Sequence, residues 1–258
     1  MTTTIKVIKI GGKLIEDEEK LSVFLDDFAA LEQPKILVHG GGNKATEIAG
    51  KLGYETKMVE GRRITDENSM AVITMVYGGL LNKNIVAKLQ KRNINSIGMC
   101  GADGKSIVSK KRPVKEINYG LVGDIEKINT EFIWELLQQG IVPVFSAISY
   151  SETGELLNTN ADSVASEIAV ALSSKMVTEL NYCFEKKGVL ANIADDDSVI
   201  PEIDKNKYSE LLEQKIINEG MLPKLHNCFQ ALEKGVEIVR LGDMSLLKPD
   251  SVHTKIVK

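Results

Sequence analysis

The stretches IKVIKIGGK (residues 5–13) and ILVHGGGN (residues 36–43) each place a glycine turn directly after a short apolar run. Runs of this kind, rich in β-branched residues and bounded by glycine, are typical of buried strands. Further strand-like runs alternate with helix-like segments, the pattern of an α/β protein with a largely parallel sheet. We expect strands at 4–10, 35–39, 94–99, 141–148, 176–180 and 236–241, helices near 17–32, 43–53, 66–91, 129–139, 160–173, 207–219 and 223–234, and short hairpins within 105–127.

The composition is that of a soluble globular protein with one large domain or two closely joined lobes. The 258 residues are 43% hydrophobic and 26% charged, with a net charge of −4 mixed along the chain, which argues against a nucleic-acid-binding surface. No apolar run approaches the roughly 20 residues of a membrane helix. Cys100, Cys183 and Cys228 have neither metal-ligand spacing nor an even count, so we expect no metal site and a reducing, cytoplasmic location.

The two glycine turns indicate a phosphate site. Glycine allows the backbone to approach a ligand closely and to point successive N–H groups at it. Gly11, Gly12, Gly41 and Gly42 are the candidates, and lysines flank the first pair. The segment GADGKS at 101–106 lacks the first glycine of a P-loop and is interpreted as a tight turn.

Two later segments contain further candidates. In LNTNADS (157–163), Asn160 or Asp162 could cap the helix that follows, or Asp162 could hold lysine ammonium groups in place. In GMLPK (220–224), proline suits the first turn of a helix, so Lys224 would lie at an anion-favouring helix N-terminus, or simply at the surface.

The predicted helix 66–91 is unusually apolar. Such a helix is either buried in the core or packed on another subunit. Gly78 and Gly79 in its middle weaken the helix but permit close approach of a neighbour.

Seven short motifs, in order and at matching spacing, resemble the amino acid kinase family over nearly the whole chain. The resemblance is strongest to its members that phosphorylate N-acetyl-L-glutamate. It implies a three-layer αβα sandwich with a central, mainly parallel sheet, in one domain (1–258) with an acylglutamate-binding lobe (about 1–174) and a nucleotide-binding lobe (about 175–258). The motifs are KIGG (9–12), HGGGN (39–43), GRRIT (61–65), NK (82–83), GLVGD (120–124), NTNAD (158–162) and GMLPK (220–224).

The resemblance also implies a mechanism. ATP, with Mg²⁺ carried by the nucleotide, would phosphorylate the side-chain carboxylate of an N-acyl-L-glutamate, the second step of arginine biosynthesis. Lys9 would neutralise charge on the transferring phosphoryl group, Lys224 would do so toward the leaving β-phosphate, and Asp162 would orient both lysines. The four glycines would supply N–H groups around the γ-phosphate. A carboxylate nucleophile is already ionised, so no general base is needed.

The substrate residues and the assembly follow from the same resemblance. Arg63 would grip the substrate α-carboxylate, and Asn158, Gly41 and Gly42 would also contact the substrate. The helix 66–91 would form the interface of a homodimer. No nucleic-acid or membrane partner is expected.

The chain departs from the family pattern in two places. Arg62 stands where relatives usually have leucine; it either points into solvent or pairs with a second carboxylate, as in N-succinyl-L-glutamate. In the segment 178–189, Glu179 replaces an aspartate and several residues are inserted before Gly188, where relatives contact the nucleotide. The altered segment is the one feature that favours a non-catalytic acylglutamate sensor, and the retained charges at the phosphate site favour an enzyme.

Overall fold

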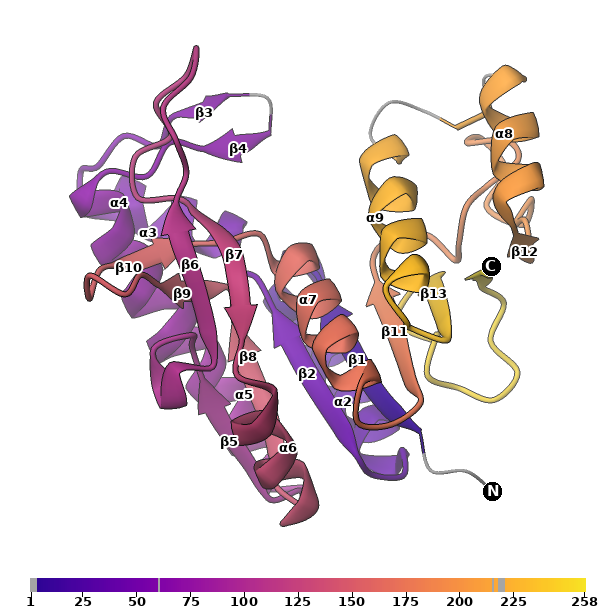
Figure 1. Cartoon of the computed structure of the whole chain (residues 1–258), viewed down its shortest axis with the longest axis horizontal. Helices are drawn as coiled ribbons and strands as arrows, with labels where there is room; N and C mark the ends of the chain where they lie inside the picture. Colours follow the sequence, from indigo (N-terminus) through magenta and orange to yellow (C-terminus); the bar gives the residue numbers. More distant parts are fainter. Residues whose placement is uncertain (1–3, 60, 215, 218–220) are drawn as a thin grey trace.

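One eight-stranded sheet forms the centre of the molecule (Figure 1). The computed structural model describes residues 4–59, 61–214, 216–217 and 221–258. Neighbouring strands from β13 to β5 are parallel, while β14 runs antiparallel to β13, so the predicted, mainly parallel sheet is confirmed. In spatial order the strands are β12 (Glu202–Ile203), β14 (Thr254–Ile256), β13 (Ile238–Gly242), β11 (Thr178–Cys183), β1 (Ile5–Ile10), β2 (Lys35–His39), β8 (Val142–Ser146) and β5 (Ser96–Met99).

Helices cover both faces of the sheet, which confirms the three-layer αβα architecture. One apolar core lies between the sheet and α6, α7, α8 and α9, and a second core lies on the opposite face. The helices of the first face are α6 (Thr130–Gln138), α7 (Ala161–Ser173), α8 (Lys205–Glu213) and α9 (Leu222–Glu233). Those of the second face are α1 (Gly12–Glu16), α2 (Glu18–Ala30), α3 (Gly42–Lys51), α4 (Glu67–Ile73), η1 (Thr74–Leu81) and α5 (Asn82–Gln90).

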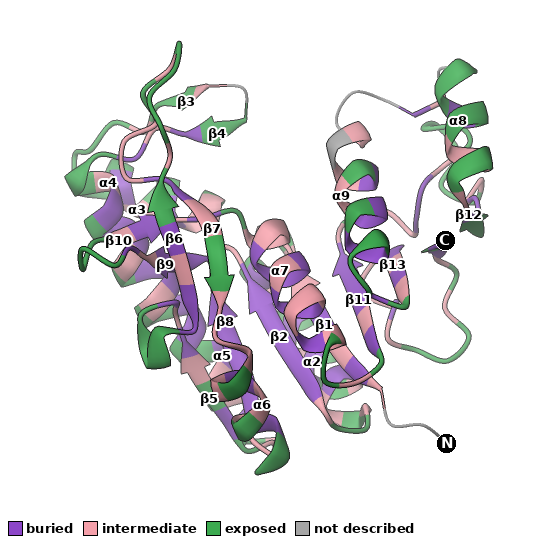
Figure 2. Ribbon diagram, in the orientation of Figure 1, coloured by how far each residue is buried: buried purple, intermediate pink, exposed green. Residues whose placement is uncertain are grey.

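The alternation of side chains along β1 assigns its residues to the two cores. Ile5 and Val7 pack in the core with α7, whereas Ile8 and Ile10 pack in the opposite core. Since side chains in a strand alternate with a period of two, Lys9 lies on the α7 face. The central strands are almost wholly buried, as the purple ribbons of Figure 2 show.

The predicted helix 66–91 is a continuous run of α4, η1 and α5, with a π-helical turn over Thr74–Leu81. By length and composition alone the run Glu67–Gln90 could cross a membrane, a property that the core helix of a soluble protein can share. This differs from the sequence expectation that no apolar run approaches the length of a membrane helix. One side of the helix packs in the second core, through Met70, Ile73, Val76, Tyr77, Leu81, Ile85 and Leu89.

A second, four-stranded sheet of order β10-β9-β6-β7 lies beside the central one. Its β6 (Ile107–Lys111) and β7 (Gly123–Ile128) are the antiparallel hairpin expected within 105–127. The strands β9 (Ile148–Tyr150) and β10 (Leu156–Asn158) complete it. The segment GADGKS forms the predicted tight turn, with a 3₁₀ turn, η2 (Asp103–Lys105), and Gly104 at φ 58°.

Several element bounds differ from the sequence expectation. The run 141–148 divides into β8 and β9, and β11 continues past 180 to Cys183. The helix expected over 207–219 ends as α8 at Glu213, and residues 215 and 218–220 lie outside the described part. Two short strands, β3 (Met58–Val59) and β4 (Arg62–Arg63), form a hairpin that was not expected.

Candidate active site

Three charged side chains from distant parts of the chain meet near the carboxyl end of β1. The Lys9 Nζ lies 2.7 Å from Asp162 Oδ1 in an ion pair. The Lys224 Nζ donates a hydrogen bond of 2.7 Å to Asp162 Oδ2. One carboxylate therefore holds two ammonium groups, one on each oxygen.

Local structure explains how each of the three groups is placed. Lys9 is the penultimate residue of β1, on the face that α7 covers. Asp162 lies in the first turn of α7, where Asn160 acts as the N-cap and accepts a 3.0 Å hydrogen bond from the Ser163 N–H. Because Asn160 caps the helix, Asp162 is free for the lysines, which decides between the two interpretations of this motif. Lys224 lies in the first turn of α9, and Gly220 of the same motif lies outside the described residues.

The electrostatics of this cluster favour an ionised Asp162. Burial raises the pKa of Asp162, but the charges and hydrogen bonds of Lys9 and Lys224 outweigh burial and bring the pKa to about 2, from an ordinary 3.8. The carboxylate is thus charged at neutral pH, and the cluster carries one net positive charge. Such a site suits an anion with distributed charge, such as a phosphoryl group.

Packing does not require glycine at either position of the first glycine turn, Gly11 and Gly12. Gly11 is the N-cap of α1 with an extended φ of −85°, a conformation open to any residue. A Cβ at Gly11 would lie 3.8 Å from Cys183 O, and one at Gly12 would lie 3.8 Å from Glu16 Oε1. Since these are ordinary contacts, packing does not demand glycine at either position, and the absence of side chains lets a ligand approach the backbone.

In the second glycine turn, by contrast, packing does constrain Gly41. Gly41 has φ 154° and is the N-cap of α3. A Cβ there would lie 2.3 Å from Leu81 Cδ1 and 3.1 Å from the Tyr77 ring, both on η1. The apolar helix 67–90 therefore packs directly under this turn.

Arg63 is buried and fastened to the N-terminal turn of α3. Its guanidinium donates hydrogen bonds of 2.9 Å to Gly42 O, 2.7 Å to Thr46 Oγ1 and 3.0 Å to Thr56 Oγ1. This places a fixed positive charge beside Gly42, at the start of a helix. Thr46 was not identified from the sequence, because it lies four residues after the glycine turn with no charge of its own.

Asn158 joins the same region through Thr65. The Asn158 Nδ2 donates a 3.0 Å hydrogen bond to Thr65 Oγ1, and the buried Thr65 hydroxyl donates to Arg63 O at 3.3 Å. The structure therefore brings Arg63 and Asn158, 95 positions apart in sequence, into one hydrogen-bonded group. Thr65 was not singled out before, although its place in the GRRIT motif could have identified it.

Arg62 occupies the opposite face of the β4 strand and is exposed. Within the described ranges, its guanidinium makes no side-chain hydrogen bond or ion pair. Neighbouring residues of a strand point to opposite faces, so Arg62 does not share the contacts of Arg63. Arg62 thus presents an exposed guanidinium next to Arg63 in the sequence, on the other face of β4.

The divergent segment after residue 178 is tied to its surroundings by ion pairs. Glu179, partly buried on β11, pairs with Arg240 on the neighbouring strand β13. Glu185, in the inserted part, pairs with Lys13 of α1 at 2.8 Å, with both side chains largely exposed. Glu179 is therefore engaged within the sheet and does not stand free for a ligand.

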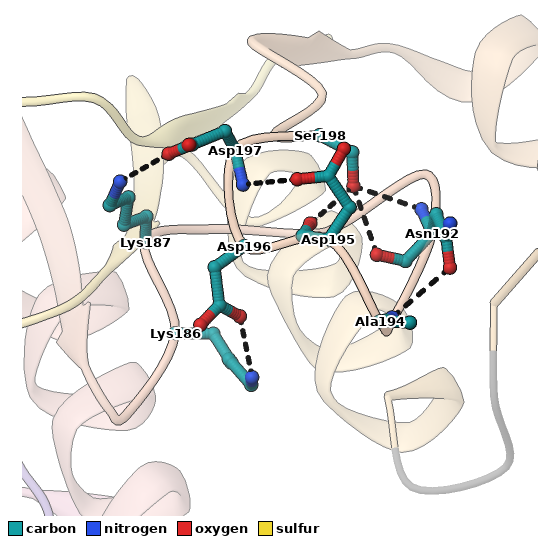
Figure 3. A network of polar contacts seen from close by, with 8 residues as sticks. All are labelled: Lys186, Lys187, Asn192, Ala194, Asp195, Asp196, Asp197 and Ser198. Carbon is teal, nitrogen blue, oxygen red and sulfur yellow. Dashed lines mark hydrogen bonds and ion pairs between the residues drawn. The ribbon is translucent and has the colours of Figure 1, made fainter.

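The inserted residues also contact the acidic turn Asp195–Asp197, as Figure 3 shows. Lys186 pairs with Asp196 at 2.6 Å and Lys187 pairs with Asp197 at 2.5 Å. The aspartates are exposed, as expected for a solvated turn, but their pairing with these lysines was not expected. The two segments thus form one polar loop structure beside the end of β11.

Comparisons with known proteins agree on one family. The pattern of the amino acid kinase family matches residues 4–243. The chain is 50% identical over 258 residues to the acetylglutamate kinase of Bacteroides thetaiotaomicron, covering 100% of both chains. It is 53% identical over 239 residues to the acetylglutamate kinase of Phocaeicola vulgatus, covering 93% of each.

Solved structures agree in fold. The crystal structure of smu.665 from Streptococcus mutans superposes with a TM-score of 0.79 at 26% identity and covers 98% of each chain. Carbamate kinase from Giardia lamblia, at 12% identity, covers 99% of this chain and 98% of its own with a TM-score of 0.68, and so shares the fold. The chain belongs to the amino acid kinase family.

Proposed function

We propose that this protein uses ATP to phosphorylate the side-chain carboxylate of N-acetyl-L-glutamate, the second step of arginine biosynthesis. The observation that carries the proposal is the cluster of Lys9, Asp162 and Lys224, with both ammonium groups within 2.7 Å of one carboxylate. Full-length identity of 50% to an acetylglutamate kinase supports the choice of substrate. A sensor would have no use for two lysines oriented in this way.

The chemistry follows from charge. Phosphoryl transfer spreads negative charge over the oxygens of the moving group, and catalysis consists of positioning and electrostatic stabilisation. Lys9 stabilises the phosphoryl group in transit, Lys224 stabilises the leaving phosphate, and Asp162 holds both in place. Backbone N–H groups of Gly11, Gly12, Gly41 and Gly42 complete the cradle, on the pattern of the family.

The substrate carboxylate is the nucleophile. It is ionised at neutral pH and attacks the γ-phosphorus directly, so no side chain has to remove a proton. Arg63 binds the α-carboxylate, because it places a fixed cation beside Gly42. Asn158, held through Thr65, contacts the same substrate.

Magnesium would be held by the nucleotide phosphates. In the described ranges, no three His, Cys, Asp or Glu side chains gather into a group that could hold a metal ion. Asp162, the carboxylate of the cluster, already carries two ammonium groups. This fits Mg²⁺, which is commonly bound through substrate phosphates and waters; when bound, it neutralises phosphate charge.

The assembly is a further part of the proposal. We infer two lobes, with the acylglutamate in about 1–174 and the nucleotide in about 175–258, and a homodimer formed through the helix 67–90. Met75 and Leu80 on this helix are 54% and 43% exposed in the single chain, an apolar surface that a second copy would cover. A wild type that runs as a monomer in light scattering would contradict the dimer, and a Leu80→Glu variant that keeps a dimeric mass would contradict this interface. A cytoplasmic location fits ATP-dependent biosynthesis and the three free cysteines.

The exposed Arg62 favours a second candidate substrate, N-succinyl-L-glutamate. A guanidinium pairs well with a carboxylate, and the succinyl group carries one that the acetyl group lacks. If Arg62 binds that carboxylate, Arg62→Leu loses turnover of succinylglutamate and keeps turnover of acetylglutamate. Equal preference in both proteins would eliminate this candidate.

The test of the function is ATP turnover coupled to ADP detection, over a panel of N-acylglutamates. Wild type is expected to depend on the acylglutamate, and Lys9→Met to lower kcat by about 10²–10³-fold. Lys6→Met is the matched control, since Lys6 lies on the same strand but its side chain points to the opposite face. Binding of acylglutamate without ADP release, or equal rates in Lys9→Met and Lys6→Met, would refute the proposal.

A further inference from the structure

A polar network lies fully buried beneath the second glycine turn, in otherwise apolar surroundings. The Asn82 Nδ2 lies 3.0 Å from His39 Nε2 and donates a 2.9 Å hydrogen bond to Val144 O. The His39 and Asn82 side chains are both 0% exposed. Burying polar groups costs free energy unless every one is hydrogen-bonded. Apolar side chains would fill the same space at lower cost, so His39 and Asn82 are candidates for a functional role.

The contacts determine the tautomer of His39. Its Nδ1 lies 2.8 Å from Gly40 O, which accepts, so we assign the proton to Nδ1. The Nε2 then accepts from Asn82. Burial lowers the pKa of His39 to about 4, and a nearby Lys83 charge acts in the same direction, so the ring is neutral at working pH. One ring nitrogen therefore donates permanently to the carbonyl of the next residue.

The amide that holds the ring is itself fastened at its other end. The Lys83 Nζ donates to Asn82 Oδ1 at 3.2 Å and to Gly98 O at 2.9 Å. A Cβ at Gly98 would lie 1.9 Å from Asn82 Oδ1, so only glycine fits there. The network thus links β2, β8 and β5, and a fully satisfied network of this kind is rigid.

The hydrogen bond from His39 to Gly40 O determines the orientation of the Gly40–Gly41 peptide group. The C=O and N–H of a trans peptide are coplanar and point in opposite directions. Because the C=O of Gly40 points to the His39 ring, the N–H of Gly41, in the same peptide, points away from that ring. Within the part of the chain that the structure describes, neither Gly41 nor Gly42 donates its N–H to a backbone acceptor.

From this geometry we infer that His39, held by Asn82, is a positioning residue that aims the Gly41 N–H at the transferring phosphoryl group. His39 touches neither substrate; it acts through the Gly40–Gly41 peptide. The inference rests on the proposed function. It gives a role to HGGGN and NK, two motifs of the chain whose polar side chains take no direct part in the proposed chemistry.

Two substitutions at one position separate positioning from packing. Asparagine at 39 places an amide N–H near the position of Nδ1, whereas leucine fills the space without a donor. We expect His39→Leu to lower kcat by about 10- to 100-fold, part of what loss of an oxyanion donor costs. We expect the KM for acylglutamate to change less than kcat, because the contacts of Arg63 and Asn158 stay in place. His39→Asn should restore most of the lost kcat.

A double variant controls for misfolding. His39→Leu leaves one Asn82 donor without its partner, and His39→Leu with Asn82→Leu removes that orphan. Since both residues act through the same peptide, the double variant should lose no more kcat than His39→Leu alone. Circular dichroism and thermal unfolding would identify the folded variants.

Wild-type kcat in His39→Leu would overturn the inference. So would a folded His39→Asn that loses as much kcat as His39→Leu, since packing would then explain both. Wild type without acylglutamate-dependent ATP turnover would overturn the proposed function, and this inference with it.

Discussion

Replacing Asp162 with asparagine keeps the size of the side chain and removes the charge that holds Lys9 and Lys224. Burial raises the pKa of Asp162, but the two lysines outweigh burial and lower it from 3.8 to about 2. A drop of that size corresponds to about 2–3 kcal/mol in favour of the ionised form. The variant also leaves two ammonium groups, each previously 2.7 Å from the carboxylate, with no anion between them. We expect the free energy of unfolding to fall by about 2–5 kcal/mol.

The pH dependence has a definite sign. The pKa of Asp162 is lower in the folded protein than in the unfolded chain, so its contribution is present above the unfolded pKa. The contribution is lost as the pH falls from near 4 toward about 2. The stability difference between wild type and Asp162→Asn should therefore be constant near neutral pH and shrink across that range. Urea unfolding at a series of pH values measures it.

The Asp162→Asn substitution should lower kcat even where the variant is fully folded. With Asp162→Asn, the lysines lose their orientation, and we expect kcat to fall by about 10²–10³-fold in the coupled assay. Glu167→Gln is the matched control, because Glu167 lies on the same helix and pairs with Lys234 at 3.3 Å near the surface. An exposed pair of this kind contributes about 0–1 kcal/mol. A kcat within about threefold of wild type, or a stability loss no larger than that of Glu167→Gln, would refute the reasoning.

Three further substitutions test other parts of the structure. Arg63→Lys should raise the KM for acylglutamate by about 10- to 100-fold, because an ammonium cannot keep the forked contacts of the guanidinium; steady-state kinetics with each substrate varied would show an unchanged KM for ATP. Gly41→Ala should destabilise the protein by about 1–3 kcal/mol, because its Cβ would lie 2.3 Å from a leucine methyl group, and thermal unfolding measures this. On the same helix Gly50→Ala, with open space around its Cβ, should stabilise by up to about 1 kcal/mol, so equal effects at both glycines would contradict the packing argument. Lys35→Met should lower the free energy of unfolding by about 1–3 kcal/mol, because the buried ammonium donates to carbonyls at the C-terminal end of α2. The kcat should stay unchanged, and a lower kcat in the folded variant would contradict this expectation.

The six longer strands of the central sheet were predictable because most of their side chains are buried. Such strands appear in the sequence as short apolar runs, and β1, β2, β5, β8, β11 and β13 each fall on one. The capped helices were predictable for a similar reason, since amphipathic periodicity and capping residues are local. The short strands β3, β10, β12 and β14 were not, because two or three residues carry too little pattern to distinguish a strand from a loop.

The residues of the candidate site, and the contact of Asp162 with Lys9 and Lys224, could be predicted from the motifs and the family resemblance. The hydrogen bonds that connect the rest of the site could not. Lys9, Asp162 and Lys224 stand in recognisable motifs, so their chemistry could be inferred from residue type and family resemblance. Thr65 and Thr46, which connect Arg63 to Asn158 and to α3, carry no charge and no distinctive local pattern. The pairing of Lys13 with Glu185 joins residues 172 positions apart, which no local reading can anticipate.

The sequence by itself determined the sheet, the glycine turns and the set of charges, because each depends on local periodicity or on residue chemistry. The residues alone left open whether Asp162 caps α7 or holds lysines, and the tertiary structure decided this. Asn160 took the cap, and so left Asp162 for Lys9 and Lys224. The tertiary structure also buries His39 beneath the second glycine turn, where its Nδ1–H donates a hydrogen bond to the Gly40 carbonyl. Both outcomes depend on the packing of elements far apart in the chain, and short-range sequence patterns carry no information on that packing.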